Sequence, residues 1–421
     1  GNVPPELSAV RQLVERGHAV TVLTDDSAAS EARATGAEVR RWVRAPNRTD
    51  RRPESDPTRD WECRYPWQLI RRAIDTLLVG PARGYADDVG EAIAQCKPSL
   101  VICSMFCLGG MVAAEAAGIP FVVLFPNIYP LPASGMPPFG LGLQPARGPI
   151  GRWRDRVLNG FVERQFDSKG LAGLNALRRQ HGLAPLAHIF DQVRAAGSQL
   201  VMTSSEFDFP ATLPPGARYV GPVLDDPLWA QLWSSMPPDG QNPLVLVAMS
   251  STFQDQISSL QRVIDALGML PVRAIVTTGP AIDGAALKAP ANVAIMARAP
   301  HRDVLEFAAL VVTHGGHGTV MKALAAGVPM VLLPHGRDQA DNAVRVTARG
   351  AGVALKRSAQ PSAIAAAVRR VLQNASYRAA AEQLGEAVRR DAASDALVRE
   401  LEGIPGEGDD GETSHRPSWP G

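Results

Sequence analysis

The sequence has few cysteines, few aromatic residues and no excess of either charge. Its 421 residues include four cysteines, and aromatic residues make up 5%. Lys plus Arg number 43 and Asp plus Glu number 42, which leaves a net charge of +1. A chain so nearly balanced lacks the broad positive field that attracts nucleic acids or anionic membranes. We therefore expect no nucleic-acid partner.

Long apolar runs are absent as well. No run reaches the ~18 to 20 residues needed to span a bilayer, and no signal peptide opens the chain, so we expect a cytoplasmic protein. The cysteines form no paired C-x-x-C spacing and have no His cluster beside them. We interpret them as small buried residues rather than as disulfides or metal ligands. They are Cys63, Cys96, Cys103 and Cys107.

Short apolar runs alternate with amphipathic stretches almost throughout the chain. This pattern indicates βα units on parallel sheets, and the length suits two domains. We therefore expect an α/β fold with two Rossmann-like parallel-sheet domains facing each other across a cleft. The predicted strands are residues 19–24, 38–43, 100–104, 120–125, 244–249, 273–277, 293–296, 310–313, 330–333 and 353–355. The clearest predicted helices are residues 5–16, 83–95 and 108–117.

Composition divides the chain into four parts. Residues 1–221 form the expected first domain, the Pro-rich residues 222–243 a linker, and residues 244–402 the second domain. Residues 403–421 have no periodicity and are expected to be disordered. The first residues resemble a loop entering a helix, whereas an α/β domain normally opens with a buried strand. We expect a start methionine, a first strand and part of a glycine-rich loop to precede them.

Two long loops interrupt the alternation. Residues 126–149 are rich in Pro, Gly and apolar side chains and follow the carboxyl end of a predicted strand, where open α/β sheets bind ligands. We expect this loop to form a binding wall. Residues 44–67 are rich in Arg, Pro and Asp, and we interpret them as a surface excursion.

Residues 309–343 contain the most informative segment, ALVVTHGGHGTVMKALAAGVPMVLLPHGRDQADNA. The strand at 310–313 runs into a glycine-rich turn and then into a helix. Glycines there let the backbone approach a ligand, and the free N–H groups and dipole of the helix start favour a phosphate. The ring of His314 and the hydroxyl of Thr319 add side-chain donors for a diphosphate.

A second loop lies beside this one, because neighbouring parallel strands end at the same edge of a sheet. There Asp338-Gln339 opens another helix, and an acid next to an amide suits hydrogen bonding to sugar hydroxyls. A Rossmann hydride-transfer enzyme is the alternative, since Gly316-x-Gly318 resembles part of its fingerprint. However, Met321 occupies the third glycine position of that fingerprint.

The spacing of these motifs resembles the donor signature of the family 1 glycosyltransferases, which have the two-domain GT-B fold. Weaker similarity extends over nearly the whole chain, and it is greatest to bacterial enzymes that decorate natural products such as macrolides and aromatic polyketides. The signature residues are His314-x-Gly316-x-Gly318-Thr319, then Ala323-Leu324-x-x-Gly327-x-Pro329, then Asp338-Gln339-x-x-Asn342-Ala343.

The resemblance implies a donor site in the second domain. His314 and the backbone at Gly316, Gly318 and Thr319 would hold the diphosphate, and Asp338 and Gln339 the sugar. His317 belongs to the same motif, although the residues alone give it no role. Thr252, with Ser250 and Ser251, would make a second diphosphate contact. Arg298 and His301 would flank the base, with Arg298 in place of the usual stacking aromatic residue.

Three positions depart from the family pattern. Lys322 stands where a Glu usually grips the ribose hydroxyls. It either alters how the ribose is held or simply faces solvent. Asn2 stands at the position of the catalytic His or Asp, and Ser104 at the position of the Asp that orients that His. The usual acid–base pair is therefore missing.

The expected reaction is transfer of a sugar from a UDP- or TDP-linked donor to a small, largely apolar acceptor, with inversion and without a metal or other cofactor. The protein would be a monomer or homodimer. One alternative is a weakened paralogue that binds sugar nucleotides as an accessory protein, which the missing base positions favour. A nucleotide-sugar epimerase with the same fold is another.

Overall fold

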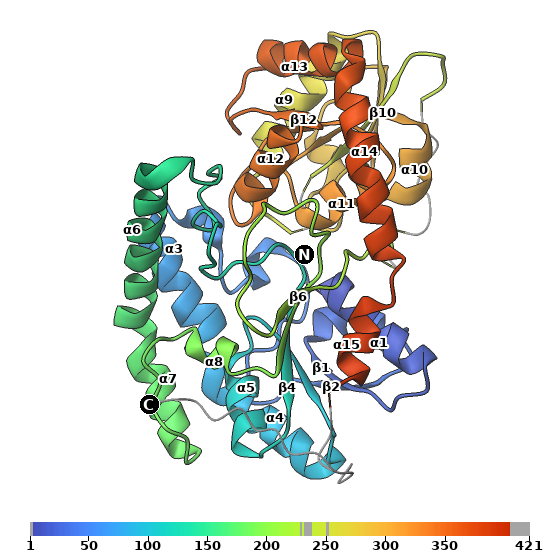
Figure 1. Cartoon of the computed structure of the whole chain (residues 1–421). Coiled ribbons are helices and arrows are strands. Elements are labelled where there is room, and N and C mark those ends of the chain that lie inside the picture. Colours follow the sequence, from blue (N-terminus) through green and yellow to red (C-terminus); the bar gives the residue numbers. More distant parts are fainter. Residues whose placement is uncertain (1–2, 228–229, 231–237, 250–251, 405–421) are drawn as a thin grey trace.

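The computed structural model describes residues 3–227, 230, 238–249 and 252–404. It contains two α/β domains, one above the other (Figure 1). All paired strands within the sheets of both domains are parallel. Among the described residues, no helix is both long and apolar enough to cross a membrane.

The first domain has its strands in two sheets. The smaller pairs β1 (Thr21–Thr24) with β2 (Glu38–Arg41), and the larger has the order β3-β4-β5-β6. The larger sheet consists of β3 (Val101–Ser104), β4 (Phe121–Phe125), β5 (Ser198–Val201) and β6 (Ala217–Tyr219). The helices of the first domain are α1 (Val3–Glu15), α2 (Ala29–Arg33), α3 (Pro66–Ala73), α4 (Ala82–Cys96), α5 (Leu108–Ala116), α6 (Gly148–Phe166), α7 (Ala172–Gln180) and α8 (Asp191–Arg194).

The second domain has one six-stranded sheet of order β12-β11-β10-β7-β8-β9. The strand order reverses between β7 and β10: β8 and β9 lie on one side of β7, and β10, β11 and β12 lie on the other. Open α/β sheets bind ligands beyond the carboxyl ends of the strands at such a point. The strands are β7 (Leu244–Ala248), β8 (Arg273–Thr277), β9 (Val293–Met296), β10 (Ala308–Thr313), β11 (Met330–Leu332) and β12 (Gly352–Ala354). The helices are α9 (Ile257–Gly268), α10 (His301–Phe307), α11 (His317–Ala325), α12 (Gln339–Ala348), α13 (Pro361–Gln373) and α14 (Ala375–Ala392).

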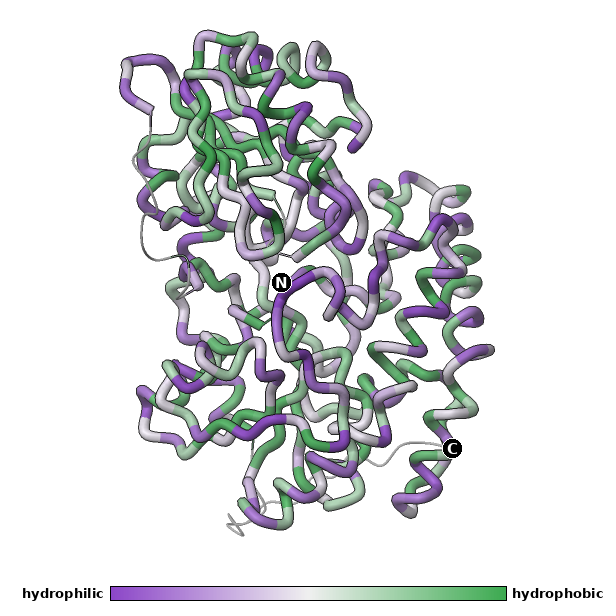
Figure 2. The backbone as a smooth tube through the Cα atoms, turned by 180° about the vertical axis from the view of Figure 1, so that it is seen from behind, coloured by the Kyte–Doolittle hydropathy of each residue, from purple (hydrophilic) through white to green (hydrophobic). Residues whose placement is uncertain are grey.

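Central strands read as continuous apolar runs because helices cover both faces of the sheets. Every residue of β4 (FVVLF) and of β7 (LVLVA) is buried, and Figure 2 shows hydrophobic stretches of chain, in green, running through the interior of both domains. All ten strands predicted from the sequence are present. Strands β5 and β6 were not predicted, because β5 begins with polar Ser198 and Gln199 and β6 has only three residues.

The end of the described chain returns to the first domain. Helix α15 (Ala396–Glu402) places Leu397, Val398 and Leu401 in a core cluster with residues of α1 and β4. The sequence assigns residues 244–402 to the second domain, but α15 packs into the core of the first. Its apolar face is buried there, below the long helix α14 (Figure 1).

A buried ion pair also joins the domains. The Arg345 guanidinium on α12 lies 2.7 Å from a carboxylate oxygen of Asp208, and the two side chains are 3% and 0% exposed. The Tyr219 hydroxyl donates to the other oxygen of Asp208 at 3.1 Å. The guanidinium also stacks 4.4 Å from the ring centre of Phe209. Asp208 and Arg345 therefore neutralise each other's charge, which would otherwise be buried without a counter-ion.

Replacing Asp208 with Asn should strongly destabilise the protein, because it leaves the Arg345 charge buried without a counter-ion. Removing one partner of a buried ion pair typically lowers the free energy of unfolding by about 3 to 5 kcal/mol. Glu206→Gln is the matched control, since it removes an exposed pair with Arg390 worth roughly 0 to 1 kcal/mol. Urea unfolding of both variants measures the difference, and equal losses would contradict the prediction.

Candidate functional site

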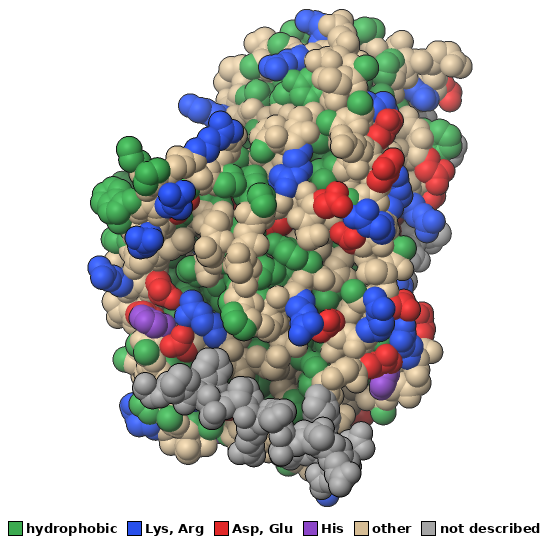
Figure 3. All heavy atoms as spheres, in the orientation of Figure 1, with side chains coloured by type: hydrophobic (Ala, Val, Ile, Leu, Met, Phe, Trp, Pro, Cys, Tyr) green, Lys and Arg blue, Asp and Glu red, His purple; other side chains and the backbone are tan. Residues whose placement is uncertain are grey.

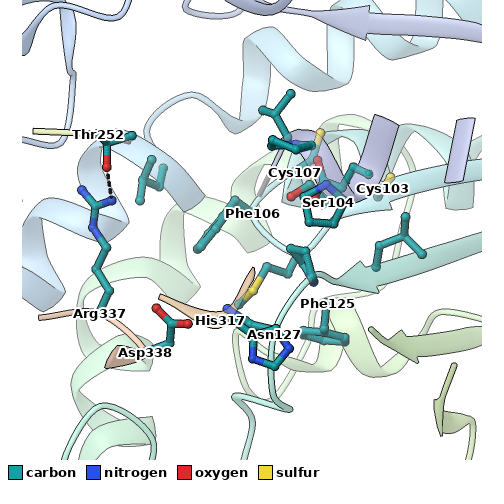
Figure 4. A pocket seen from close by; sticks show the side chains of 18 of the residues that line it. Cys103, Ser104, Phe106, Cys107, Phe125, Asn127, Thr252, His317, Arg337 and Asp338 are labelled. Carbon is teal, nitrogen blue, oxygen red and sulfur yellow. Dashed lines mark hydrogen bonds between the residues drawn. The ribbon is translucent and has the colours of Figure 1, made fainter. Parts of the chain in front are cut away.

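A continuous cavity of ≈ 1910 Å³ lies between the domains, at the carboxyl ends of their strands. The second domain lines it with His314, Gly318 and Thr319, and the first domain with Ser104. In the close view of Figure 4, Ser104 and Phe106 lie on one wall while Arg337 and Asp338 lie on the other. The cavity is thus placed for two substrates to meet, one on each wall.

The helix start at α11 is open to this cavity. Gly316 is the N-cap of α11, and a Cβ atom built at Gly318 would have no atom within 4 Å. Gly315 has φ +92°, and a side chain there would also come within 3.0 Å of the Gln339 carbonyl oxygen. The turn therefore requires glycine at position 315, and the bare N–H groups that follow can face an anion.

His314 lies directly against this turn. A Cβ atom at Gly316 would lie 2.6 Å from its Nε2 atom, so the ring uses the space that a side chain would need. Burial is the main reason that the pKa of His314 falls to about 3, and the neighbouring His335 lowers it further. The ring is therefore neutral at pH 7, with one nitrogen able to donate and the other able to accept.

Asp338 and Gln339 take different roles at the start of α12. Asp338 lines the cavity and accepts a bond from the Asn342 amide at 2.8 Å. The amide oxygen of Gln339 accepts from the backbone N–H of His335 at 2.8 Å, and its nitrogen bonds the side chain of Gln254. Gln339 is 1% exposed, so its amide shapes the loop, and Asp338 is the freer of the two for a ligand.

His317, although it belongs to the sequence motif, is a packed residue. Its Nδ1 atom lies 3.3 Å from the Asn342 amide oxygen, and its ring packs edge-on against Phe207. Burial is the main cause that lowers the pKa of His317. These contacts fix the first turn of α11 against α12.

Arg337 is a cleft residue that the sequence reading missed. It adopts a left-handed backbone conformation, with φ +57°. Its guanidinium makes two bonds to the Asp60 carboxylate, of 2.6 and 2.9 Å, and a third to the Thr252 hydroxyl at 2.9 Å (Figure 4 shows the third). Asp60 belongs to the first domain, so this contact joins the two walls of the cavity.

Residues 44–67 are therefore more than a surface excursion, and the prediction for that loop was wrong. Besides Asp60, the loop places Trp61 edge-on against Phe253 at 5.1 Å. Residues 126–149, predicted as a binding wall, do line the cavity with Phe139 and Leu141. The carboxylate of Asp341 holds this second loop to α12, accepting from backbone N–H groups at 2.6 and 3.0 Å.

The far end of the second-domain wall contains an unexpected ion pair. The Lys322 ammonium lies 2.6 Å from Asp226, and the two side chains are 12% and 8% exposed. Of the two alternatives for Lys322, the one in which it faces solvent is therefore wrong. The neighbouring His301 bonds the Thr277 hydroxyl at 3.0 Å, and burial with the nearby Lys322 charge lowers its pKa to about 4. Arg298 lines the same end of the cavity.

Some expected site residues have no described position. Asn2, Ser250 and Ser251 lie outside the described residues. The cysteines are all free thiols, but only Cys103 is fully buried and Cys96 is exposed, so the prediction of burial was wrong for Cys96. Within the described part of the chain, no three His, Cys, Asp or Glu side chains are grouped as a metal site would require.

Comparison with known proteins agrees with this architecture. Residues 261–404 match the Erythromycin biosynthesis protein CIII-like C-terminal domain, and residues 7–169 match a Glycosyl transferase 4-like domain. The chain is 28% identical over 424 residues to the 4'-demethylrebeccamycin synthase of Lentzea aerocolonigenes. That match covers 94% of this chain and 95% of the relative.

Solved structures show the same arrangement of domains. CalG4, the calicheamicin glycosyltransferase, has a TM-score of 0.72 at 25% identity, covering 95% of this chain and 94% of that one. The glycosyltransferase VinC in complex with DTDP has a TM-score of 0.65 at 19% identity, covering 96% and 95%. Two parallel-sheet domains facing across such a cleft are the GT-B fold.

The sequence relatives narrow this class. Over most of its length the chain is similar to glycosyltransferases that act on bacterial natural products, and it is an enzyme that transfers sugars from nucleotide-sugar co-substrates.

Arg337 and Asp60 should behave as one unit in stability measurements. Arg337→Met and Asp60→Asn should each lower the melting temperature, and the double variant should lose less than their sum. The coupling should be roughly 0.5 to 3 kcal/mol, as for residues in direct contact. The exposed pair of Arg357 and Asp255 is the control and should give near-additive losses. Additivity at Arg337 and Asp60 would show that they do not interact in solution.

Proposed function

We propose that this enzyme moves a sugar from a UDP- or TDP-linked donor to a small, largely apolar natural-product acceptor, with inversion at the anomeric carbon. The observation that carries the proposal is the bare helix start of α11, which opens into a cavity shared by two domains. The α11 wall would hold the diphosphate through Gly316, Gly318, Thr319 and His314. The first domain would hold the acceptor.

The donor end uses neutral groups and dipoles. As the bond between sugar and diphosphate breaks, negative charge grows on the leaving phosphate. N–H groups at the start of α11 and the donor nitrogen of His314 are fixed in place to stabilise that charge, so they need no reorganisation. Attack from the opposite wall then reaches the far face of the anomeric carbon, which inverts its configuration.

The acceptor end is apolar. Phe106 and Phe125 line the cavity below the donor wall, and Phe139 and Leu141 extend it along the 126–149 loop. Such a lining favours a hydrophobic acceptor with few polar groups. Relatives named for rebeccamycin and calicheamicin support an acceptor of this class. The proposal needs no metal or other cofactor and no nucleic acid, and it places a monomer or homodimer in the cytoplasm.

The nucleoside end has a carboxylate from an unexpected source. Lys322 lies one helical turn after Thr319 on α11, so it faces the group that follows the diphosphate. It holds Asp226, from the interdomain linker, whose other oxygen accepts from the Arg302 backbone N–H at 3.0 Å. We propose that Asp226 accepts from the ribose hydroxyls in place of the Glu that the family usually has at position 322.

Replacing His314 with Ala should weaken UDP and TDP binding on the order of 10- to 100-fold, the loss expected for a hydrogen bond to a charged group. Isothermal titration calorimetry measures the change. His188→Ala is the control, because His188 is exposed and pairs with Asp167 outside the cavity. Unchanged nucleotide affinity in His314→Ala would place the diphosphate elsewhere.

Replacing Asp226 with Asn should weaken UDP binding by about 10-fold, because a neutral amide accepts less strongly from hydroxyls. Binding of 2',3'-dideoxyuridine diphosphate, which lacks both hydroxyls, should change little. Asp225→Asn is the matched control, since Asp225 pairs with Arg11. Equal losses for both nucleotides would show that Asp226 does not contact the ribose.

A further inference from the structure

A carboxyl group with no assigned role lies at the wall opposite the donor site. Glu6, in the first turn of α1, lines the cavity. The Ser104 side chain lies close enough to this carboxyl group to lower its pKa. The Oε1 atom of Glu6 is shielded from solvent and has no hydrogen-bond partner among the described residues. A shielded oxygen without a partner is costly, which indicates a group kept for something that binds there.

The position of Glu6 suits the acceptor rather than the donor. Side chains on a helix tilt toward its N-terminus, so the carboxyl group of Glu6 projects toward the beginning of α1. Ser104, at the end of β3, lies across the cavity from Asp338 and Arg337 (Figure 4). Ser104 therefore faces the donor wall, and Glu6 lines the same cavity and interacts with Ser104.

Asp338 lies on the opposite wall, where it accepts from the Asn342 amide, and several other acidic side chains that line the cavity are engaged by a cation or a backbone N–H. Asp60 is bound by Arg337, and Asp226 by Lys322. Glu163 is paired with Arg194, and Asp25 accepts from the Arg48 backbone N–H. Within the described residues, Glu6 is the carboxylate that keeps a shielded oxygen without a partner.

We propose that Glu6 is the catalytic base of the transfer reaction, oriented by the Ser104 hydroxyl, and that it takes the place of the base missing at position 2. The inference rests on the proposed function and adds the group that accepts the acceptor's proton. Ser104 is a positioning residue in this scheme, because its hydroxyl donates to the carboxylate and does not touch the acceptor.

The step balances as a displacement. The acceptor O–H gives its proton to the Glu6 carboxylate while its oxygen forms a bond to the anomeric carbon. The bond from that carbon to the diphosphate oxygen breaks, and the electron pair leaves with the nucleoside diphosphate. Glu6 ends as a neutral carboxylic acid and returns its proton to water after the product leaves.

The ionisation of Glu6 suits this role. Burial raises the pKa of Glu6 to about 7, although the Ser104 hydrogen bond opposes the shift. A base works best when its pKa lies near the working pH. Among the described residues, the titratable groups that interact with Glu6 are the thiols of Cys103 on β3 and Cys107 at the start of α5. The charges of Arg11 and Glu15, farther along α1, pair with each other on the exposed side of that helix.

The test uses Glu6→Gln and Glu6→Ala in the full chain, with UDP-glucose and dTDP-glucose as donors. The acceptors are 4-nitrophenol, which ionises readily, and 2-phenylethanol, which needs a base. Glu6→Gln should lower kcat for the alcohol by about 10²- to 10⁴-fold and affect the nitrophenol far less. UDP affinity should not change. Glu15→Gln is the matched control on the same helix and should behave as the unaltered chain.

Two further measurements separate a base from a structural role. Formate added to Glu6→Ala should restore part of the alcohol rate, because it fits the space and accepts the proton. In the unaltered chain kcat/KM for the alcohol should rise with pH through about 7 and level off above it, since only the ionised carboxylate is a base. Glu6→Gln should lose that rise while melting no lower at pH 8.

The outcomes distinguish this inference from the function on which it rests. Full alcohol transfer by Glu6→Gln, or equal losses for both acceptors without formate rescue, would overturn the assignment of Glu6 alone. No transfer by the unaltered chain to any acceptor would overturn the proposed function and the inference with it. UDP binding that disappears in Glu6→Gln would show a fold or donor-site defect instead of a base.

Discussion

The active cleft depends on how α12 is tied to the first domain. Arg345 buries its charge against Asp208, and Asp341 on the same helix binds the backbone of the 126–149 loop. Both contacts bury a charged group. Loss of either partner would leave that group buried without compensation, which is strongly unfavourable. The strand ends of the two sheets face each other because these contacts fix them there, and the opposed donor and acceptor walls follow from that.

Burial shifts the pKa values of the two walls in opposite directions, down for His314 and up for Glu6. At the donor wall burial keeps the His314 ring neutral, so in the proposed function the diphosphate is held by N–H dipoles and an uncharged ring at this point. At the opposite wall burial raises the pKa of Glu6 into the neutral range. Under the two proposals, one cavity can therefore stabilise an anion on one side and accept a proton on the other.

The sequence predicted the two parallel-sheet domains and every strand with a clear apolar run, since a strand covered on both faces must be apolar. It also brought together most residues of the donor wall, because strand ends in one parallel sheet share an edge. It missed Arg337 and Asp226, whose partners lie far away in the chain. It also could not foresee that α15 would pack into the first domain, since an amphipathic helix does not specify which core it covers.

The departures at Lys322 and Asn2 have a common physical explanation under the two proposals. A binding site requires a carboxylate or a base at a point in space, and it does not require that the group come from a given position in the chain. Lys322 recruits a carboxylate from the linker by ion pairing, so the negative group returns to the ribose end from another segment. Glu6 reaches the acceptor side from the first turn of the helix that follows Asn2. A comparison of the motif position by position finds two losses here, whereas under the two proposals groups from other positions, Asp226 and Glu6, take over both roles.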